Sequence, residues 1–274
     1  MRNNQRRLQD VQAPTPQPQS QAPGMVYAVP TDFVELPSRG MFYPADHPLC
    51  GKKTIEIKYM TAKEEDILSS ATLIKNGLVI DRFLESIIVD TAIDPKTLLV
   101  GDRNAMMVAS RSTAYGYGYD LNVVCNDCDR KSTYTFDLTK SKMVENCFDD
   151  EFLKLINCSY NKEKCSYEIN LPISNILVGV KLLTGADLLD SIDLDENLVT
   201  NILSQFVVSV NGDMTPAIVK DFIQNMPAGD SKFLRDRYMK LVPNIDLTQG
   251  FFCNHCGASE DKEVPLSAEF FWPK

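Results

Sequence analysis

The sequence has few histidines and lacks the long apolar runs on which several classes of protein depend. It contains 2 histidines in 274 residues, so general acid–base chemistry would fall mainly on carboxylates. We find no apolar run of the roughly 20 residues that a membrane-spanning helix needs, and no apolar stretch of the signal-peptide kind at the N-terminus. We therefore expect no membrane contact, and a protein that remains in the cytoplasm in which it is made.

The motifs of the common enzyme classes are also missing. We find no G-x-S-x-G, no P-loop, no G-x-G-x-x-G after a strand and no H-E-x-x-H. The acidic stretch 187–197 lacks the ligand spacing and turn glycine of an EF-hand loop. We therefore expect a protein that is not an enzyme and has no small-molecule substrate.

Basic residues are in deficit. The formal net charge is −9 and the sequence pI about 4.8, whereas a protein that binds nucleic acid through phosphates needs a surplus of Lys and Arg. Hydrophobic residues make up 44% and charged residues 24% of the chain, as in an ordinary globular protein. The charge balance thus argues against nucleic acid as a partner, and other proteins fit better.

Composition and pattern divide the chain into six segments and predict the α+β class. The segments are a Pro- and Gln-rich disordered arm (1–24), an extended segment and strand (25–60), a helical subdomain (61–120), a first zinc knuckle (121–138), an α+β insertion (139–248), and a second zinc knuckle with a C-terminal hairpin (249–274). The arm is too poor in apolar groups to offset its ordering entropy. Its basic tip is either a solubilising tail or an arm that folds against a neighbouring subunit.

Local signals place the main helices. Residues 41–43 are expected to pack onto the core. Thr61 and Glu64 form a T-x-x-E capping box, and apolar spacing continues that helix toward Gly77. The ranges 78–93 and 101–116 are predicted as two more helices. The mixture of these helices with short strand patterns is typical of an α+β fold.

The cysteines carry the most informative pattern. Eight are present, and four of them form two C-x-x-C pairs, Cys125 with Cys128 and Cys253 with Cys256. Each pair follows two apolar residues and precedes a polar turn and a strand-like run, as in a zinc knuckle. The two-residue gap lets a tight turn point both sulfurs at one ion. The four cysteines are therefore predicted to hold one structural Zn²⁺ tetrahedrally.

The separation of the two pairs is unusual. The intervening residues 129–252 number 124, whereas zinc ribbons place their pairs roughly 15–20 residues apart. Loop-closure cost grows only logarithmically with length, so a split ribbon is feasible. Two unrelated reduced pairs, or a redox-active pair, are the alternatives. A thioredoxin-type pair should open a helix after a strand, and neither pair does.

The other histidines and cysteines are not predicted to be metal ligands. His255 lies inside the second knuckle and is interpreted as a turn residue that is not a ligand. His47 and Cys50 form an H-x-x-C half-site for which no second half stands out. The three cysteines without ligand-like spacing are interpreted as buried thiols: Cys147, Cys158 and Cys165.

Several stretches together carry a family resemblance. They are "LPSRGMFYP" (36–44), "MTAKEEDIL" (60–68), "GDRNAMMVASR" (101–111), "VVCNDC" (123–128) and the closing "FFCNHCG" with "EVPLSAEFFWP". They resemble the T-even-like tailed-phage (myovirus) baseplate hub and hub-assembly protein family. The resemblance covers roughly 31–135 and 249–273, and among functional positions only the four knuckle cysteines transfer.

The resemblance implies a late protein of the virion tail baseplate, assembled in the host cytoplasm. Its partners would be other baseplate and tail proteins in a symmetric hetero-oligomeric assembly, and its role would be either permanent component or transient assembly factor. A zinc-ribbon regulator that binds nucleic acid is the competing hypothesis. It would use Arg130 and Lys131 beside the first knuckle, although the second knuckle is followed by acidic residues.

Overall fold

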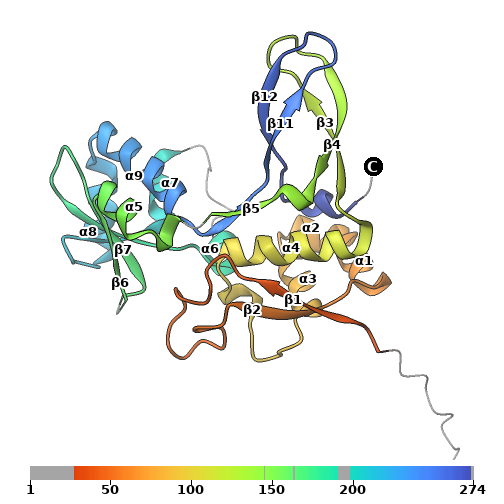
Figure 1. The fold of residues 1–274 in the computed structure, drawn as a ribbon. Coiled ribbons are helices and arrows are strands. Elements are labelled where there is room, and N and C mark those ends of the chain that lie inside the picture. Colours follow the sequence, from red (N-terminus) through yellow and green to blue (C-terminus); the bar gives the residue numbers. More distant parts are fainter. Residues whose placement is uncertain (1–27, 145, 163, 191–197, 273–274) are drawn as a thin grey trace, which may run out of the picture.

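The computed structural model describes residues 28–144, 146–162, 164–190 and 198–272, so the predicted arm 1–24 lies outside the described residues. The described chain mixes helices with short antiparallel strands, which confirms the α+β class. Figure 1 shows three parts: a helical body, a sheet with its own helices beside the body, and a projection of two hairpins that rises from the body.

The helical body combines one two-stranded ribbon with several helices. Strands β1 (Thr31–Glu35) and β2 (Thr54–Lys58) pair antiparallel, with Phe33 opposite Glu56. The helices are α1 (Ala62–Leu68), α2 (Ala71–Lys75), α3 (Val79–Ile87), the 3₁₀ turn η1 (Pro95–Thr97) and α4 (Val100–Tyr115). The body core is formed largely by α3 and α4, through buried apolar side chains such as Phe83 and Met106.

The capping box is confirmed, but the helix that it starts is shorter than expected. Glu64 accepts hydrogen bonds from the Thr61 N–H at 2.9 Å and the Thr61 hydroxyl at 2.6 Å. The predicted single helix is two helices, because the chain breaks at Ser69. The Ser69 hydroxyl donates to the Glu65 carbonyl at 2.7 Å, and serine side chains that bond backbone in this way compete with helix continuation.

The predicted helix 78–93 also ends early. The helix α3 stops at Ile87, and Ile88 forms an antiparallel bridge with Ile57 of β2. The next N–H, from Val89, donates to the Glu56 carbonyl at 3.2 Å. Three consecutive β-branched residues favour extended backbone over helix, so the chain leaves α3 as a short edge of the ribbon.

Two of the resembling stretches meet at a buried carboxylate. Asp102, near the start of α4, accepts from the Ser38 N–H at 2.9 Å, the Ser38 hydroxyl at 2.5 Å and the Tyr43 hydroxyl at 2.7 Å. Burial raises the pKa of Asp102 against the effect of these donors. Phe42 and Tyr43 pack into the core as expected, but Met41 is 57% exposed, so its predicted burial is wrong.

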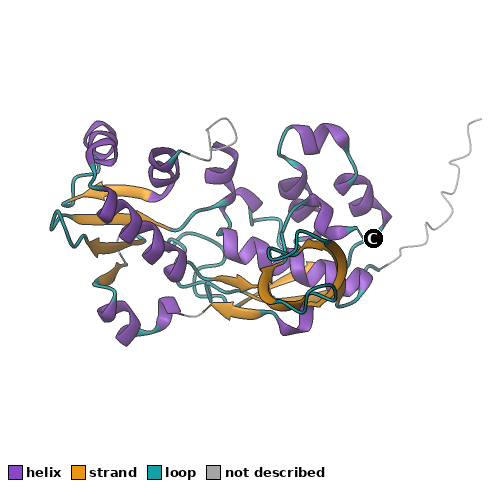
Figure 2. Ribbon diagram, turned by 90° about the horizontal axis from the view of Figure 1, so that it is seen from above, coloured by secondary structure: helices purple, strands orange, loops and turns teal. Residues whose placement is uncertain are grey.

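The second part is built on one antiparallel sheet in the order β6-β7-β8-β9. Its strands are β6 (Cys158–Asn161), β7 (Ser166–Asn170), β8 (Leu177–Lys181) and β9 (Val207–Val210), and its helices are α5 (Asp150–Leu155), α7 (Val199–Phe206), α8 (Pro216–Asn225) and α9 (Ala228–Leu241). The helix α6 (Gly185–Asp190) follows β8 and packs against η1 of the helical body. Phe206 and Tyr238 stack at 4.0 Å between ring centroids and join α7 to α9. Seen from above, this part lies to one side of the body (Figure 2).

A short strand pair connects the parts. Strand β5 (Lys142–Val144) pairs with β10 (Asn244–Asp246), and the start of α4 packs against β10. Gly101 permits this approach, because a Cβ there would lie 1.9 Å from the Pro243 carbonyl oxygen. Across the described ranges, none of the helices has the length and apolar character to span a bilayer.

Candidate metal centre

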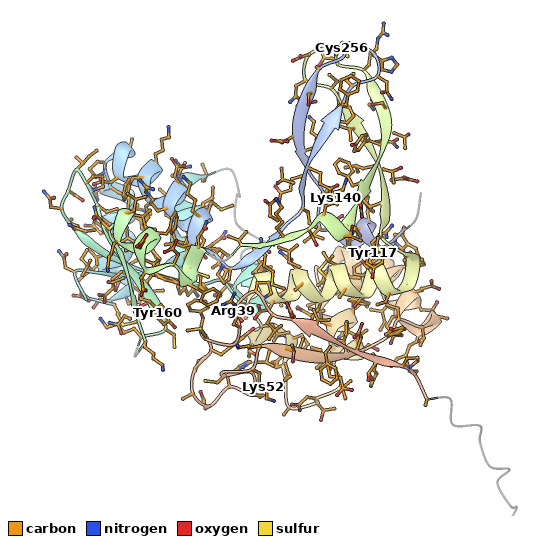
Figure 3. All side chains as sticks on the ribbon, in the orientation of Figure 1. Arg39, Lys52, Tyr117, Lys140, Tyr160 and Cys256 are labelled. Atoms are coloured by element: carbon orange, nitrogen blue, oxygen red, sulfur yellow. The ribbon has the colours of Figure 1, made fainter. Side chains whose placement is uncertain are left out.

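The four predicted cysteines lie at the tips of two hairpins. The first hairpin is β3 (Gly118–Val124) and β4 (Lys131–Asp137), and the second is β11 (Thr248–Phe252) and β12 (Ser259–Glu263). The hairpins stand side by side and form the projection. Figure 3 places Cys256 at the far end of the projection and Tyr117 and Lys140 at its base.

The two tips have matching turns. The Cys125 carbonyl accepts from the Asp129 N–H at 2.9 Å, and the Cys253 carbonyl accepts from the Gly257 N–H at 2.9 Å. Both donors have left-handed backbone, with φ 54° at Asp129 and 78° at Gly257. Glycine adopts this conformation freely and aspartate more readily than most residues. Each turn thus folds its two cysteines back toward the other hairpin.

The sulfurs form one compact cluster across the hairpins. Cys125 Sγ lies 3.7 Å from Cys256 Sγ, and Cys128 Sγ lies 3.7 Å from Cys253 Sγ. All four lie within 4.8 Å of one another. A tetrahedral ion with Zn–S bonds of about 2.3 Å would separate its sulfurs by about 3.8 Å. The donor set and its spacing therefore fit a metal such as zinc.

The thiols differ in their ionisation. Backbone N–H groups of Cys256 and His255 point at the Cys253 sulfur and lower its pKa to about 7. At Cys256 the Ala258 N–H favours the thiolate, but lost hydration and the neighbouring thiols outweigh it and raise the pKa to about 12. Without an ion, one thiolate is therefore expected to share the protons of its neighbours. A divalent ion would take the place of those protons.

Side chains align the hairpins below the cluster. The Gln249 side chain bonds the main chain of Asp137 twice, accepting from its N–H at 3.1 Å and donating to its carbonyl at 2.8 Å. The Tyr134 hydroxyl donates to the Gly250 carbonyl at 3.0 Å, and its ring meets Phe251 edge-on at 5.4 Å. These contacts fix the spacing of the hairpins independently of any ion.

Arg111 of α4 holds the base of the projection. Its Nε donates to the Phe270 carbonyl at 3.0 Å, and its terminal nitrogens donate to the Gly116 carbonyl at 2.9 Å and the Gly118 carbonyl at 3.1 Å. The guanidinium also lies 5.0 Å from the centroid of the Tyr119 ring. Burial lowers the pKa of Arg111. One side chain thus joins α4, the start of β3 and the C-terminal segment.

The C-terminal segment after β12 is anchored in the body. It forms the 3₁₀ turn η4 (Ala268–Phe271), in which Phe270 and Phe271 are fully buried. Phe271 packs on Phe83 of α3 with ring centroids 4.7 Å apart. Both ends of the second hairpin are therefore fixed, its tip beside the first knuckle and its foot in the core of the body.

The side chains of the histidines and of the other cysteines do not belong to this sulfur cluster. The His255 side chain is exposed in the turn. His47 stacks on Tyr43 at 4.2 Å, and its Nε2 lies 2.9 Å from the Thr97 hydroxyl. Cys147 and Cys158 are buried as predicted, whereas Cys165 is half-buried and Cys50 exposed. The prediction of a buried thiol is therefore wrong for Cys165, which lies in the turn before β7 and has φ 46°.

Sequence reasoning missed the residues that support the cluster. Gln249, Tyr134 and Arg111 act through main-chain carbonyls and rings of segments distant in sequence. A recognisable signal was the aromatic pattern within each hairpin, since aromatic residues in both predict that the two pack on one another. No comparable signal marks Arg111, because an arginine in a helix is most often solvated.

The fold and the cluster define an α+β protein whose two distant hairpins join in a ribbon-type four-cysteine centre. Residues 42–272 match the family model of the T4 bacteriophage base plate protein, and the chain belongs to this family. None of the curated proteins and none of the solved structures compared with the chain matches it. Family membership supports a structural protein of the phage baseplate and a place in the virion tail.

Proposed function

We propose that the chain is a non-enzymatic structural or assembly protein of the baseplate hub region, stabilised by one structural Zn²⁺. The observation that carries the proposal is the cluster of four sulfurs, contributed by segments 125 positions apart between Cys128 and Cys253, in a chain of the baseplate family. Cys125, Cys128, Cys253 and Cys256 would be the ligands.

The proposed ion would supply a cross-link. Each hairpin contributes two thiolates, and the backbone N–H groups of the turns stabilise their charge. Four thiolates leave no open position for water, so such a centre holds structure and does not hydrolyse. The centre would make the tip of the projection more acidic, because four thiolates carry two charges more than the ion neutralises.

Metal content tests this part of the proposal. We expect the purified full chain to contain about one zinc, and the Cys253→Ser variant to lose it together with part of its stability. Cys50→Ser is the matched control, because Cys50 is an exposed cysteine outside the cluster, and it should retain the zinc. A metal-free chain whose two pairs form disulfides reversibly would contradict the structural centre.

The proposed partners are neighbouring baseplate and tail subunits in a symmetric hetero-oligomer, assembled in the host cytoplasm late in infection. Mass spectrometry of purified particles separates the two forms of the proposal. A constant copy number relative to other tail proteins indicates a component. Absence from particles, combined with failed tail assembly when the chain is missing, indicates an assembly factor.

The segment limits stay part of this proposal, with 139–248 as an insertion between the zinc knuckles. Limited proteolysis tests them. Early cleavage is expected near 24, at the end of the proposed arm. If the arm resists protease as well as the body does, its limit is wrong.

The geometry does not favour the nucleic-acid regulator. Arg130 and Lys131 are exposed at the first tip, but Lys262 on the second hairpin pairs with Glu260 at 3.2 Å. The other charged residues of β12 are all acidic. A phosphate-binding surface needs several unopposed cations. Affinity for DNA at low salt that falls steeply as salt is added would revive this function.

A further inference from the structure

Strand β1 of the helical body packs against α4, and its outer edge is free in one sense: it has no backbone hydrogen-bond partner among the described residues. The Leu36 N–H donates to the Lys53 carbonyl at 2.8 Å, so this pair is hydrogen-bonded and the pairing alternates from there along β1. Because of this alternation, the N–H and C=O groups of every second residue of β1 point away from β2. The outward residues are Thr31, Phe33 and Glu35.

The two sides of the ribbon differ. The outer side of β2 is used, because the Glu56 carbonyl accepts from Val89 and Ile57 bridges Ile88. For the outer side of β1, no backbone partner exists within the described ranges. Among the outward N–H groups of β1, the Phe33 N–H alone has an acceptor in the part of the chain that the structure describes, the carboxylate of the adjacent Asp32 at 2.8 Å. Figure 1 shows the ribbon on the side of the body opposite the projection.

The free edge carries an exposed aromatic ring at its centre. Phe33 is 65% exposed and lies on the same face of the ribbon as its cross-strand partner Glu56. The strand has no proline, lysine or bulge within Thr31–Glu35, and these are three of the devices that keep edge strands from pairing. Its charged side chains are those of Asp32 and Glu35. An apolar ring beside unpaired backbone groups is typical of a strand that receives another strand.

We propose that β1 pairs antiparallel with β1 of a second copy of this chain, about a two-fold axis at Phe33. The result is a continuous sheet in the order β2-β1-β1-β2. Each of the outward pairs would exchange two backbone hydrogen bonds, for which the Phe33 N–H would leave the Asp32 carboxylate that now accepts it. The two Phe33 rings would lie side by side. The proposal goes beyond the proposed function and does not depend on the metal centre.

The residue order of β1 selects this register. With the axis at Phe33, Thr31 lies opposite Glu35 of the second copy, and Asp32 lies opposite Val34. Moving the axis to Asp32 places two aspartates opposite each other, which is destabilising. Moving it to Val34 leaves Thr31 opposite the turn that follows β1. The register at Phe33 alone pairs the whole strand without opposing like charges.

Charge across the four strands is also complementary. Thr31 lies opposite Lys58 within one copy, and it would lie opposite Glu35 of the second copy on its other side. Lys58, Thr31 and the second copy's Glu35 would then form one row across three neighbouring strands, with their side chains on the same face. Lys58 and Glu35 lie at opposite ends of the ribbon within a single chain. Any coupling between them would therefore report the contact between copies.

Sedimentation of the full chain tests the pairing. One added strand buries little area, which is typical of weak association, so loading should extend from about 5 μM to about 500 μM to bracket a Kd near 10⁻⁴ M. We expect a monomer–dimer equilibrium. Phe33→Pro should weaken it at least tenfold with unchanged thermal unfolding, because the Phe33 N–H makes no bond to β2. Phe33→Thr, which keeps that N–H, should weaken it less.

A charge exchange gives a second test that does not rely on proline. Glu35→Lys should weaken dimerisation, and adding Lys58→Glu should restore it. Three results would overturn the proposal: a wild-type chain that stays monomeric throughout, a Phe33→Pro chain that dimerises like the wild type, or a charge exchange without rescue. Association seen only after adding other tail proteins would likewise overturn it and assign the edge to a different strand.

Discussion

Replacing Arg111 by methionine should destabilise the protein strongly. The change keeps a long, flexible side chain of similar reach while it removes the guanidinium from the base of the projection. The three main-chain carbonyls that Arg111 now serves, at Phe270, Gly116 and Gly118, would lose their donors. These carbonyls lie on α4's exit, the start of β3 and the C-terminal segment, so their loss affects three parts of the fold.

The magnitude follows from opposing contributions. Hydrogen bonds from a charged donor contribute about 1.5–3 kcal/mol each, so three such bonds contribute roughly 4–9 kcal/mol. Removing the buried cation recovers several kcal/mol of desolvation, and methionine keeps much of the packing against Tyr119. The expected net loss in the free energy of unfolding is about 3 kcal/mol, which is large for a single substitution.

Urea unfolding followed by circular dichroism measures this loss as a lower midpoint at constant slope. Arg82→Met is the matched control, because Arg82 is exposed and pairs with Glu85, also exposed, at 2.7 Å. Its expected effect is within about 0.5 kcal/mol. Arg111→Lys should be intermediate, because an ammonium cannot reach three carbonyls in different directions. If Arg111→Met costs no more than the control, Arg111 does not join the three segments.

The remaining predictions concern close packing and pH. Gly101→Ala should lower the free energy of unfolding, measured by urea, by about 2–3 kcal/mol, because its Cβ would lie 1.9 Å from the Pro243 carbonyl oxygen. At an ordinary helix glycine the same change would raise the free energy of unfolding. Gly118→Ala is the control, because the nearest contact of its Cβ would be at 3.6 Å. Burial lowers the pKa of His47 below 6.5, so the folded chain binds a proton at His47 less readily than the unfolded chain does. The free energy of unfolding should therefore be at its full value above pH about 6.5 and fall as the pH drops through the folded pKa. Thermal unfolding from pH 7.5 to 5.5 should show this fall in the wild type and a smaller one in His47→Asn; equal falls would exclude His47 as its source.

The sequence predicted elements whose signals are local. The Thr61 and Glu64 capping box lies within one helical turn, and α4 ends at Tyr115, directly before the glycine that predicts its stop, Gly116, so both appear where expected. The cluster of four cysteines was also predictable, because each knuckle is a short pattern that repeats. To predict that the two knuckles meet, it was enough to infer that two similar half-sites combine into one site.

Features set by distant contacts escaped prediction. The end of α3 at Ile87 depends on a bridge between Ile88 and Ile57 of a strand 31 residues earlier. The β-branched run 87–89 disfavours helix, but it does not indicate the strand with which the chain pairs. The exposure of Met41 follows from a turn that directs Phe42 and Tyr43 inward instead. The pairing of β5 with β10 joins segments about 100 residues apart, and each strand is too short to carry a pattern of its own.

The split between the two hairpins also imposes an order in time. During synthesis at about 5–20 residues per second, Cys253 emerges on the order of 10 s after Cys128. Through that interval the first hairpin holds two thiols without their partners, while all of 129–252 is made and begins to fold. The four-sulfur cluster can close only after all of 129–252 has been synthesised, so a closed centre records that the intervening chain was completed.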